Sequence, residues 1–160
     1  AMESARAHST LVSYDPNHRP ALWPPARARA IVMRSAELAD IVLPNLDEGR
    51  LLTGVHQPAD VLAEFAARGP AIVALKMGAD GVLLGAEGRT THVPAHRVVP
   101  TDATGAGDTF DGAFAARLLD GDSPLEAARY AVIAAALTTT GHGAVGPIPT
   151  ADTVRQAGDA

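Results

Sequence analysis

A glycine-rich segment supplies the residues best suited to do chemistry in this chain, namely Asp102-Ala103-Thr104-Gly105-Ala106-Gly107-Asp108-Thr109-Phe110. Gly105 and Gly107 allow the backbone to turn sharply and to bring its N–H groups close to a ligand. The sequence that follows predicts a helix from about Asp108 to Leu119, and the first turn of a helix has unpaired N–H groups and a partial positive charge. The segment therefore predicts a phosphate-binding loop, with the backbone of Gly105, Ala106 and Gly107 as donors.

Asp108 is an unusual neighbour for such a loop, because a carboxylate repels a bound anion. The residue is useful there if it accepts the proton of a hydroxyl group that attacks phosphorus. Phosphoryl transfer needs mainly positioning, charge stabilisation and one group that orients the nucleophile. The alternative is that Asp108 is only the N-cap of the helix, a position where Asp is common.

The longer run from Asp102 to Phe114 resembles the C-terminal signature of the PfkB, or ribokinase-like, carbohydrate kinases. The resemblance implies phosphoryl transfer from ATP to a hydroxyl group of a sugar or sugar acid, with Mg²⁺ as the metal. It further implies that Asp108 is the general base and faces the substrate, and that the amides of 105–108 form the anion site. The family usually has Asn where this chain has Asp111, a helical position that we expect to be peripheral.

A second motif, Asp15-Pro16-Asn17-His18-Arg19, follows a short expected strand. It resembles the Asp-x-Asn-x-Arg motif of the same family, which implies that Asn17 and Arg19 line the cleft near the phosphate and the sugar. A guanidinium group binds carboxylate or phosphate oxygens in a forked geometry that an ammonium group lacks. The alternative is an Asx-type turn closed by Asp15, with Arg19 in solvent.

A third motif, Asn45-Leu46-Asp47-Glu48, comes just after another expected strand. It resembles the Asn-x-x-Glu motif that the family ties to magnesium and phosphate. The resemblance implies that Asn45 and Glu48 act on the metal through water, which suits an ion that prefers oxygen ligands and keeps several waters. The same spacing is typical of a capping box at a helix start, and both interpretations can hold together.

A fourth motif, Lys76-Met77-Gly78-Ala79-Asp80-Gly81, resembles the nucleotide-binding loop at a strand end of the family. It implies nucleotide contacts from Lys76, Gly78, Ala79 and Gly81, in addition to those from Gly105 and Gly107. Many members have Thr where Lys76 stands. A lysine there resembles the 2-keto-3-deoxygluconate kinase branch, so this sugar acid is the favoured substrate. The alternative is a plain β-turn with two glycines.

Strands and helices in alternation must position these motifs. Short apolar runs predict strands near Leu11–Tyr14, Ile41–Leu43 and Ile72–Lys76, with helix-forming sequence between them. Glycine turns at 78–81 and 85–88 separate short strands expected at 82–84 and 90–93, which predicts a hairpin section. Helices are then expected over 125–137 and from about residue 150 to the end of the chain.

This order of elements is typical of an α/β fold with a mainly parallel sheet. The three strands should lie side by side in one sheet. The resemblance sharpens the expectation to a three-layer ribokinase-like fold in which helices flank the sheet. It implies that residues 1–160 are the C-terminal, nucleotide-binding part of one kinase domain, and that the N-terminal half and the lid are absent.

Composition excludes several other classes of protein. The formal net charge is −5 and there is no run of Lys or Arg, which argues against a nucleic-acid partner. The absence of cysteine excludes disulfides and thiol catalysis and fits a cytoplasmic location. No apolar stretch is long enough to span a membrane, so a membrane is not expected as a partner. The first residues do not have the pattern of a signal peptide. The six histidines have no spacing suited to zinc.

Three functions stay open at this point. The first is a kinase that is active in a complete protein. The second is a nucleotide- or phosphate-binding remnant without turnover. The third is one half of a split kinase, which associates with a separately encoded N-terminal half or forms a homo-oligomer. In each case we expect the isolated chain to be inactive, because the lid that excludes water is expected in the absent half.

Overall fold

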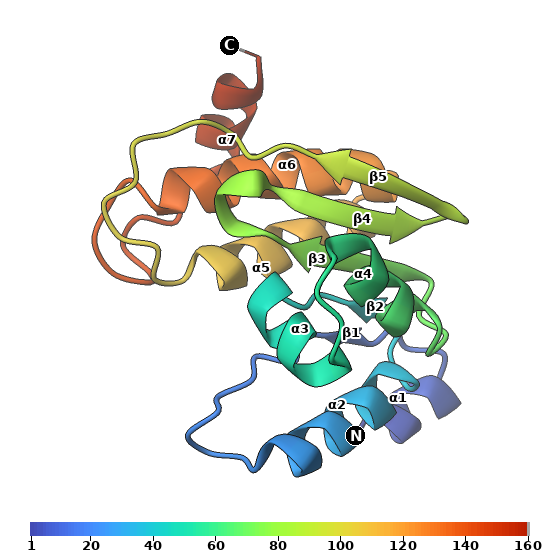
Figure 1. Cartoon of the computed structure of the whole chain (residues 1–160). Coiled ribbons are helices and arrows are strands. Elements are labelled where there is room, and N and C mark those ends of the chain that lie inside the picture. The colour runs from blue at the N-terminus through green and yellow to red at the C-terminus, as the bar shows by residue number, and fades with distance from the viewer. Residues whose placement is uncertain (160) are drawn as a thin grey trace. The chain divides into compact units, whose positions relative to one another are not determined.

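The computed structural model describes residues 1–159 and divides into two compact units (Figure 1). The first unit comprises Ala1–Met77 and Leu83–Thr91, and the second comprises Gly78–Val82 and the chain from His92 onward. Each unit has buried side chains of its own, and each contains part of the sequence motifs described above.

The first unit alternates helices and strands. In chain order these are α1 (Met2–Ala7), β1 (Ser13–Tyr14), α2 (Pro25–Ala36), β2 (Ile41–Val42), α3 (Leu46–Thr53), α4 (Pro58–Ala66) and β3 (Ile72–Lys76). β1 pairs in parallel with β2, and β2 pairs in parallel with β3. Tyr14 lies opposite Val42, which lies opposite Val73. The prediction that these three strands share one sheet is therefore confirmed.

β1 is shorter than the sequence predicted, because only two residues pair as a strand. The N–H of Val12 donates to Oδ2 of Asp40 over 2.8 Å, so a side chain takes the place of a ladder partner. The carbonyl of Val12 accepts from the N–H groups of Asp40 and Ile41. This contact between residues 28 positions apart fixes the entry into β1 without lengthening the strand.

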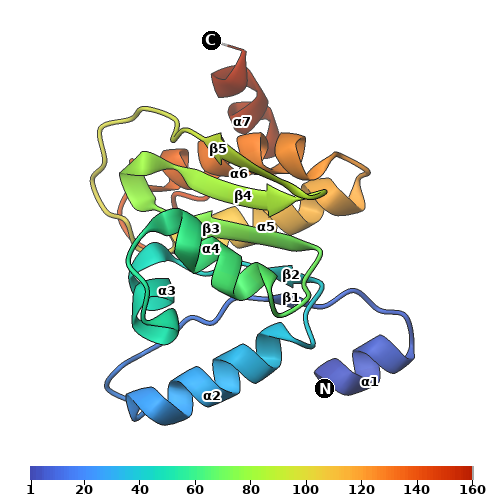
Figure 2. The same cartoon turned by 45° about the vertical axis from the view of Figure 1, so that its right-hand side comes forward.

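Two further strands, β4 (Val82–Ala86) and β5 (Arg89–Val93), complete a five-stranded sheet in the order β1-β2-β3-β4-β5 (Figure 2). A two-residue turn joins them, and both of its residues have positive φ, 53° at Glu87 and 71° at Gly88. Such a turn has the twist of a type I′ hairpin, so β5 returns antiparallel to β4. Both the mainly parallel sheet and the hairpin section were expected.

The core of the first unit forms where α3 and α4 pack near β3. α4 buries Val61, Leu62 and Phe65, which belong to one apolar cluster with Leu75 of β3. Full burial of a side chain such as Phe65 contributes about 2 kcal/mol. α3 approaches this cluster closely, because a Cβ at Gly49 would lie only 2.6 Å from Cγ1 of Val61. Apolar periodicity and one small residue thus stabilise the sheet from which the second, third and fourth motifs emerge.

The second unit is built on α5 (Ala106–Leu119), α6 (Pro124–Thr138) and α7 (Ala151–Gly158), with a short 3₁₀ turn at Gly78–Asp80. α5 and α6 lie side by side (Figure 1). Phe110 and Phe114 of α5 are buried and stacked, with 5.7 Å between ring centroids. The buried alanines of α6 permit this close packing.

Helix bounds in the second unit differ little from the prediction. α5 begins two residues earlier than expected, at Ala106. A capping box formed by Ser123 and Glu126 starts α6, and the side chain of Thr150 caps α7. Within residues 1–159, no helix combines the length and the apolar character that a membrane span requires.

Candidate active site

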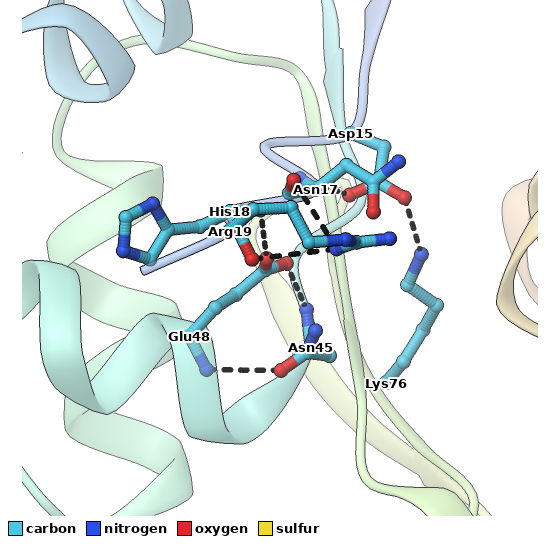
Figure 3. A network of polar contacts seen from close by, with 7 residues as sticks. All are labelled: Asp15, Asn17, His18, Arg19, Asn45, Glu48 and Lys76. Atoms are coloured by element: carbon cyan, nitrogen blue, oxygen red, sulfur yellow. Dashed lines mark hydrogen bonds and ion pairs between the residues drawn. The ribbon is translucent and has the colours of Figure 1, made fainter. Parts of the chain in front are cut away.

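A polar cluster lies where the three parallel strands of the first unit end (Figure 3). Asp15 follows β1, Asn45 follows β2, and Lys76 is the last residue of β3. Asn45 and Lys76 face each other in a parallel bridge. The carboxyl ends of parallel strands meet at one edge of a sheet, which is where open α/β sheets bind ligands.

Lys76 and Asp15 form an ion pair within this cluster. Nζ of Lys76 lies 3.1 Å from Oδ2 of Asp15, and the two side chains are only 12% and 22% exposed. The other carboxylate oxygen of Asp15 accepts the N–H of Asn17 over 2.9 Å, which closes an Asx-type turn. Asn17 itself has a φ of 43°, a left-handed conformation that Asn tolerates better than most residues.

Glu48 lies buried beneath the same loop, with 6% of its surface exposed. Its Oε1 accepts the N–H of Asn45 over 2.7 Å, and its Oε2 accepts the N–H of His18 over 2.9 Å. Oδ1 of Asn45 accepts the N–H of Glu48 in return, so the predicted capping box is present. Burial raises the pKa of Glu48, while the two backbone N–H groups act in the opposite direction.

The side-chain oxygens of Asn45 and Glu48 already serve the backbone at this site. Each carboxylate oxygen of Glu48 and the side-chain oxygen of Asn45 accepts a backbone N–H. In residues 1–159 no group of three or more His, Cys, Asp or Glu side chains is placed to hold a metal ion. The water-mediated contact of Asn45 and Glu48 with a metal stays a prediction.

Arg19 is exposed and folds back on its own loop. Its Nη1 donates to the carbonyl oxygens of Asn17 and His18, each over 3.3 Å. A guanidinium group has five N–H donors, so most of them stay available to an anion. The Asx turn and the exposed arginine of the alternative interpretation are thus both present, and they leave the ligand-binding role open.

The glycine-rich loop of the second unit ends directly at α5. Gly105 is the N-cap residue, with φ 80° and ψ −3°, and no side chain from the described residues caps this helix. Asp108 is the third residue of α5, so the alternative in which Asp108 is the N-cap is wrong. The N–H of Ala106 donates to the carbonyl oxygen of Ala103 over 3.2 Å, so the prediction that this amide serves a bound anion is wrong. Binding of an anion by the other first-turn N–H groups stays a prediction.

Gly105 is required at its position by space as well as by conformation. A Cβ there would lie 2.8 Å from the carbonyl oxygen of Ala144 and 2.9 Å from its Cα. The loop is also tied by Asp102, whose Oδ1 accepts the N–H and the hydroxyl of Thr104, and whose Oδ2 accepts the N–H of Gly143. The hydrogen bonds from Thr104 and Gly143 lower the pKa of Asp102 to about 2.

Asp108 is exposed and lines a pocket of about 440 Å³ in the second unit. Gly105, Thr109 and Gly112 line the pocket beside it, and Tyr130 of α6 and Val154 of α7 contribute to its wall. The carboxylate is therefore accessible to a small molecule at the N-terminus of α5. It could accept a proton from a hydroxyl group placed there.

The remaining predicted nucleotide-binding residues form a tight turn. Gly78 and Gly81 have φ of 60° and 88°, and a Cβ at Gly81 would lie 2.1 Å from the carbonyl oxygen of Val93. Nε2 of His92 donates to the carbonyl oxygen of Asp80 over 2.6 Å and closes the turn against β5. Ala79 is exposed on it. The glycines are thus explained by backbone geometry, and their contact with a nucleotide stays a prediction.

The structure brings together Asn17, Arg19, Asn45, Glu48 and Lys76 in the first unit, and Gly105, Ala106, Gly107 and Asp108 in the second. Sequence reasoning missed two hydrogen bonds, one from the N–H of His18 to Glu48 and one from the N–H of Gly143 to Asp102. No local pattern could have indicated either one, because 30 and 41 residues separate the partners.

Known proteins are similar to this chain in both sequence and fold. Residues 1–151 match the family described as pfkB family carbohydrate kinase. Fructokinase-1 of Oryza sativa subsp. japonica is 35% identical over 159 residues, covering 94% of this chain and 49% of the relative. The 2-dehydro-3-deoxygluconokinase of Bacillus subtilis (strain 168) is 33% identical over 153 residues, covering 93% of this chain and 47% of the relative.

Among solved structures, the fructokinase of Vibrio cholerae O395 bound to fructose, ADP and calcium ion superposes with a TM-score of 0.90 at 31% identity. The match covers 97% of this chain and 53% of that one. A putative ribokinase II from E. coli in complex with ATP and Mg²⁺ gives a TM-score of 0.88 at 28% identity, covering 98% and 51%. The chain spans about half the length of the relatives it matches, and by its sequence and fold it belongs to the pfkB family of carbohydrate kinases.

Proposed function

We propose that this chain is the C-terminal, nucleotide-binding part of a kinase that transfers a phosphoryl group from ATP to a hydroxyl group of a sugar or sugar acid. The observation that carries the proposal is the placement of Asp108. It lies in the first turn of a helix with no side-chain cap among the described residues, beside Gly105, and it opens onto a pocket. Phosphate-binding amides and one accessible carboxylate are the parts that phosphoryl transfer needs.

In this proposal the amides of Gly105, Gly107 and Asp108 hold phosphate oxygens at the N-terminus of α5, while the N–H of Ala106 donates to the carbonyl oxygen of Ala103. ATP, when bound, supplies the phosphoryl group. The carboxylate of Asp108 takes the proton from the attacking hydroxyl as the new oxygen–phosphorus bond forms and the bond to the bridging oxygen of ADP breaks. Asp108 thus acts as the general base.

Asn17 and Arg19 are proposed to contact the phosphate or an acidic group of the substrate. The exposed guanidinium of Arg19 suits a carboxylate or phosphate. For this reason we favour a 2-keto-3-deoxygluconate-like sugar acid as the substrate. The relatives include fructokinases, ribokinases and 2-dehydro-3-deoxygluconokinases at similar identity, so the support for this choice comes from the motif alone.

A second candidate is phosphate or nucleotide binding without turnover. It is favoured by the absence of a side-chain cap on α5 among the described residues, because such a helix N-terminus binds an anion whether or not Asp108 takes a proton. The same site suits one half of a split kinase. In both cases the anion site at α5 has the same role, and only the proton transfer to Asp108 distinguishes a kinase from a remnant.

The test is a chimera in which residues 1–160 replace the matching segment of the Bacillus subtilis 2-dehydro-3-deoxygluconokinase. Asp108→Asn keeps the size of the side chain but removes the proton acceptor. We expect kcat to fall by about 10²–10⁴-fold, the usual contribution of a general base. ATP affinity should stay the same or increase, because a repulsive charge is lost.

Asp111→Asn is the matched control, because it makes the same chemical change one helical turn later on α5. It should leave kcat within about twofold of the parent chimera, because the family pattern usually has Asn at this position. Turnover by Asp108→Asn close to that of Asp111→Asn, with both chimeras folded, would assign Asp108 a structural role and leave the remnant as the better description.

A further inference from the structure

The loop Asp15–Arg19, which carries Asn17 and Arg19, has little support of its own. The strand before it is two residues long, and Asn17 has a left-handed φ of 43°. The hydrogen bond from the N–H of Asn17 to Asp15 is local and exposed. A loop of this kind needs anchors from elsewhere in the chain if it is to present its side chains in one geometry.

Two anchors come from distant residues and reach opposite ends of the loop (Figure 3). At its start, the ammonium group of Lys76 holds the carboxylate of Asp15 at 3.1 Å, across 61 residues of sequence. At its end, Oε2 of Glu48 holds the N–H of His18 at 2.9 Å, across 30 residues. The imidazole of His18 is buried as well, with 9% of the residue exposed.

We propose that Glu48 and Lys76 are positioning residues, which hold the Asp15–Arg19 loop in the conformation that presents Asn17 and Arg19 to an anion. Only the role of the presented side chains rests on the proposed function. The hydrogen bonds of the Glu48 carboxylate support the assignment, because each of its two oxygens already accepts a backbone N–H of the protein.

Charge supports the same assignment for Lys76. It is the only lysine among the 160 residues. Its ammonium group is largely buried against Asp15, whose free charge would repel an anionic ligand at this edge of the sheet. Lys76 thus compensates the charge of Asp15 and fixes its direction in one interaction.

The two anchors can be measured without a ligand, by amide hydrogen exchange of the 160-residue chain. The N–H of Asn17 reports the anchor at Asp15, and the N–H of His18 reports the anchor at Glu48. In Lys76→Met we expect Asn17 to exchange roughly tenfold to a hundredfold faster, as expected for loss of an interaction with a charged group. Lys76→Arg, which keeps the charge, should restore most of the protection.

Glu48→Gln tests the second anchor. Glutamine offers one oxygen where glutamate offers two, so it can serve the cap at Asn45 or the loop at His18, but not both. The cap is local to the helix, so we expect His18 to lose its partner and to exchange at least about tenfold faster. Asp47→Asn is the matched control, because its carboxylate is exposed and contacts Arg50 on the same helix.

Increased exchange confined to residues 15–19, with β3 unchanged, supports the proposal. Unchanged exchange of Asn17 in Lys76→Met, or of His18 in Glu48→Gln, overturns it. If Lys76→Met does not fold, the unmodified protein still decides, because a single lysine gives a single ¹⁵Nζ signal. Rapid ammonium proton exchange like that of free lysine would exclude a held ion pair.

Titration with inorganic phosphate separates this inference from the proposed function. Binding that weakens in Lys76→Met and recovers in Lys76→Arg, with Arg19 resonances shifting on titration, supports presentation of the loop to an anion. If the unmodified chain binds no phosphate but the exchange data hold, the proposed function fails and the two anchors stand.

Discussion

The backbone N–H of Gly143 donates to Oδ2 of Asp102 over 2.8 Å, although 41 residues separate the two. The other oxygen of Asp102 holds the N–H and the hydroxyl of Thr104. One carboxylate thus joins the start of the glycine-rich loop to the segment whose Ala144 packs against Gly105. The proposed anion site at α5 therefore depends on a residue that need not contact the anion.

This contact should respond to acid in a defined range. The pKa of Asp102 is lowered from 3.8 to about 2 in the folded chain, because its charged form accepts three hydrogen bonds. A group with a lowered pKa contributes stability that is fully present above its unfolded pKa and is lost as the pH falls through its folded pKa. We expect the contact with Gly143 to persist at pH 4 and to weaken between about pH 3 and 2.

Amide resonances of Gly143 and Thr104, followed from pH 5 to acid, would measure this transition. Asp102→Asn should abolish the pH dependence of both resonances while other carboxylates titrate as before. A midpoint near the ordinary value for aspartate would contradict the expected stabilisation of the charged form.

Contacts that are local in sequence could be predicted, and contacts between distant residues could not. The spacing of Asn45 and Glu48 predicted a capping box, because both hydrogen bonds lie within one helical turn. The same pattern could not indicate that the second oxygen of Glu48 reaches His18. Nor could it indicate that Lys76 pairs with Asp15, because strand register alone brings those positions together.

Strand bounds followed the same rule. β3 was predicted over its full length, since the four apolar positions Ile72 to Leu75 in a row are decided by burial. β1 was predicted too long, because the side chain of Asp40, distant in sequence, takes the N–H of Val12. The start of α5 was placed two residues late, since the left-handed φ of Gly105 sets it and propensity does not.

Gly105→Ala should distort the anion site. Alanine at φ 80° is strained, and its Cβ would overlap the backbone of Ala144. We expect the free energy of unfolding to fall by about 2 kcal/mol or more. Gly112→Ala is the matched control, because Gly112 is inside α5 and a Cβ there meets nothing within 4 Å.

The control should be neutral or stabilise the chain by roughly 0.5–1 kcal/mol, since alanine favours a helix interior. Urea unfolding of the two variants measures both values on the same scale. Equal stabilities of Gly105→Ala and Gly112→Ala would mean that the loop does not need glycine at its N-cap.

The choice of substrate can be tested in the chimera described above. If Arg19 contacts an acidic group, 2-keto-3-deoxygluconate should have a higher kcat/KM than ribose or fructose. Arg19→Met should then reduce kcat/KM for the acid by roughly tenfold to a hundredfold and affect neutral sugars less, because a charge-assisted hydrogen bond is lost only with the acid. Faster phosphorylation of neutral sugars by the unmodified chimera would contradict this preference.

The isolated chain should bind nucleotide weakly and not turn over. The amides of Gly107 and Asp108 lie in the first turn of α5, where no side chain of residues 1–159 caps the helix, so phosphate groups can reach them. A sugar kinase must also exclude water from the reacting phosphate, or hydrolysis competes with transfer. We expect the segment that closes the site to lie in the part of the relatives that this chain does not match.

We therefore expect ATP to shift the amide resonances of residues 105–108 while a coupled assay detects no sugar-dependent release of ADP. Shifts without turnover would agree with a nucleotide-binding part that needs the rest of a kinase. Sugar-dependent ADP release by the 160-residue chain would show that it closes its own site.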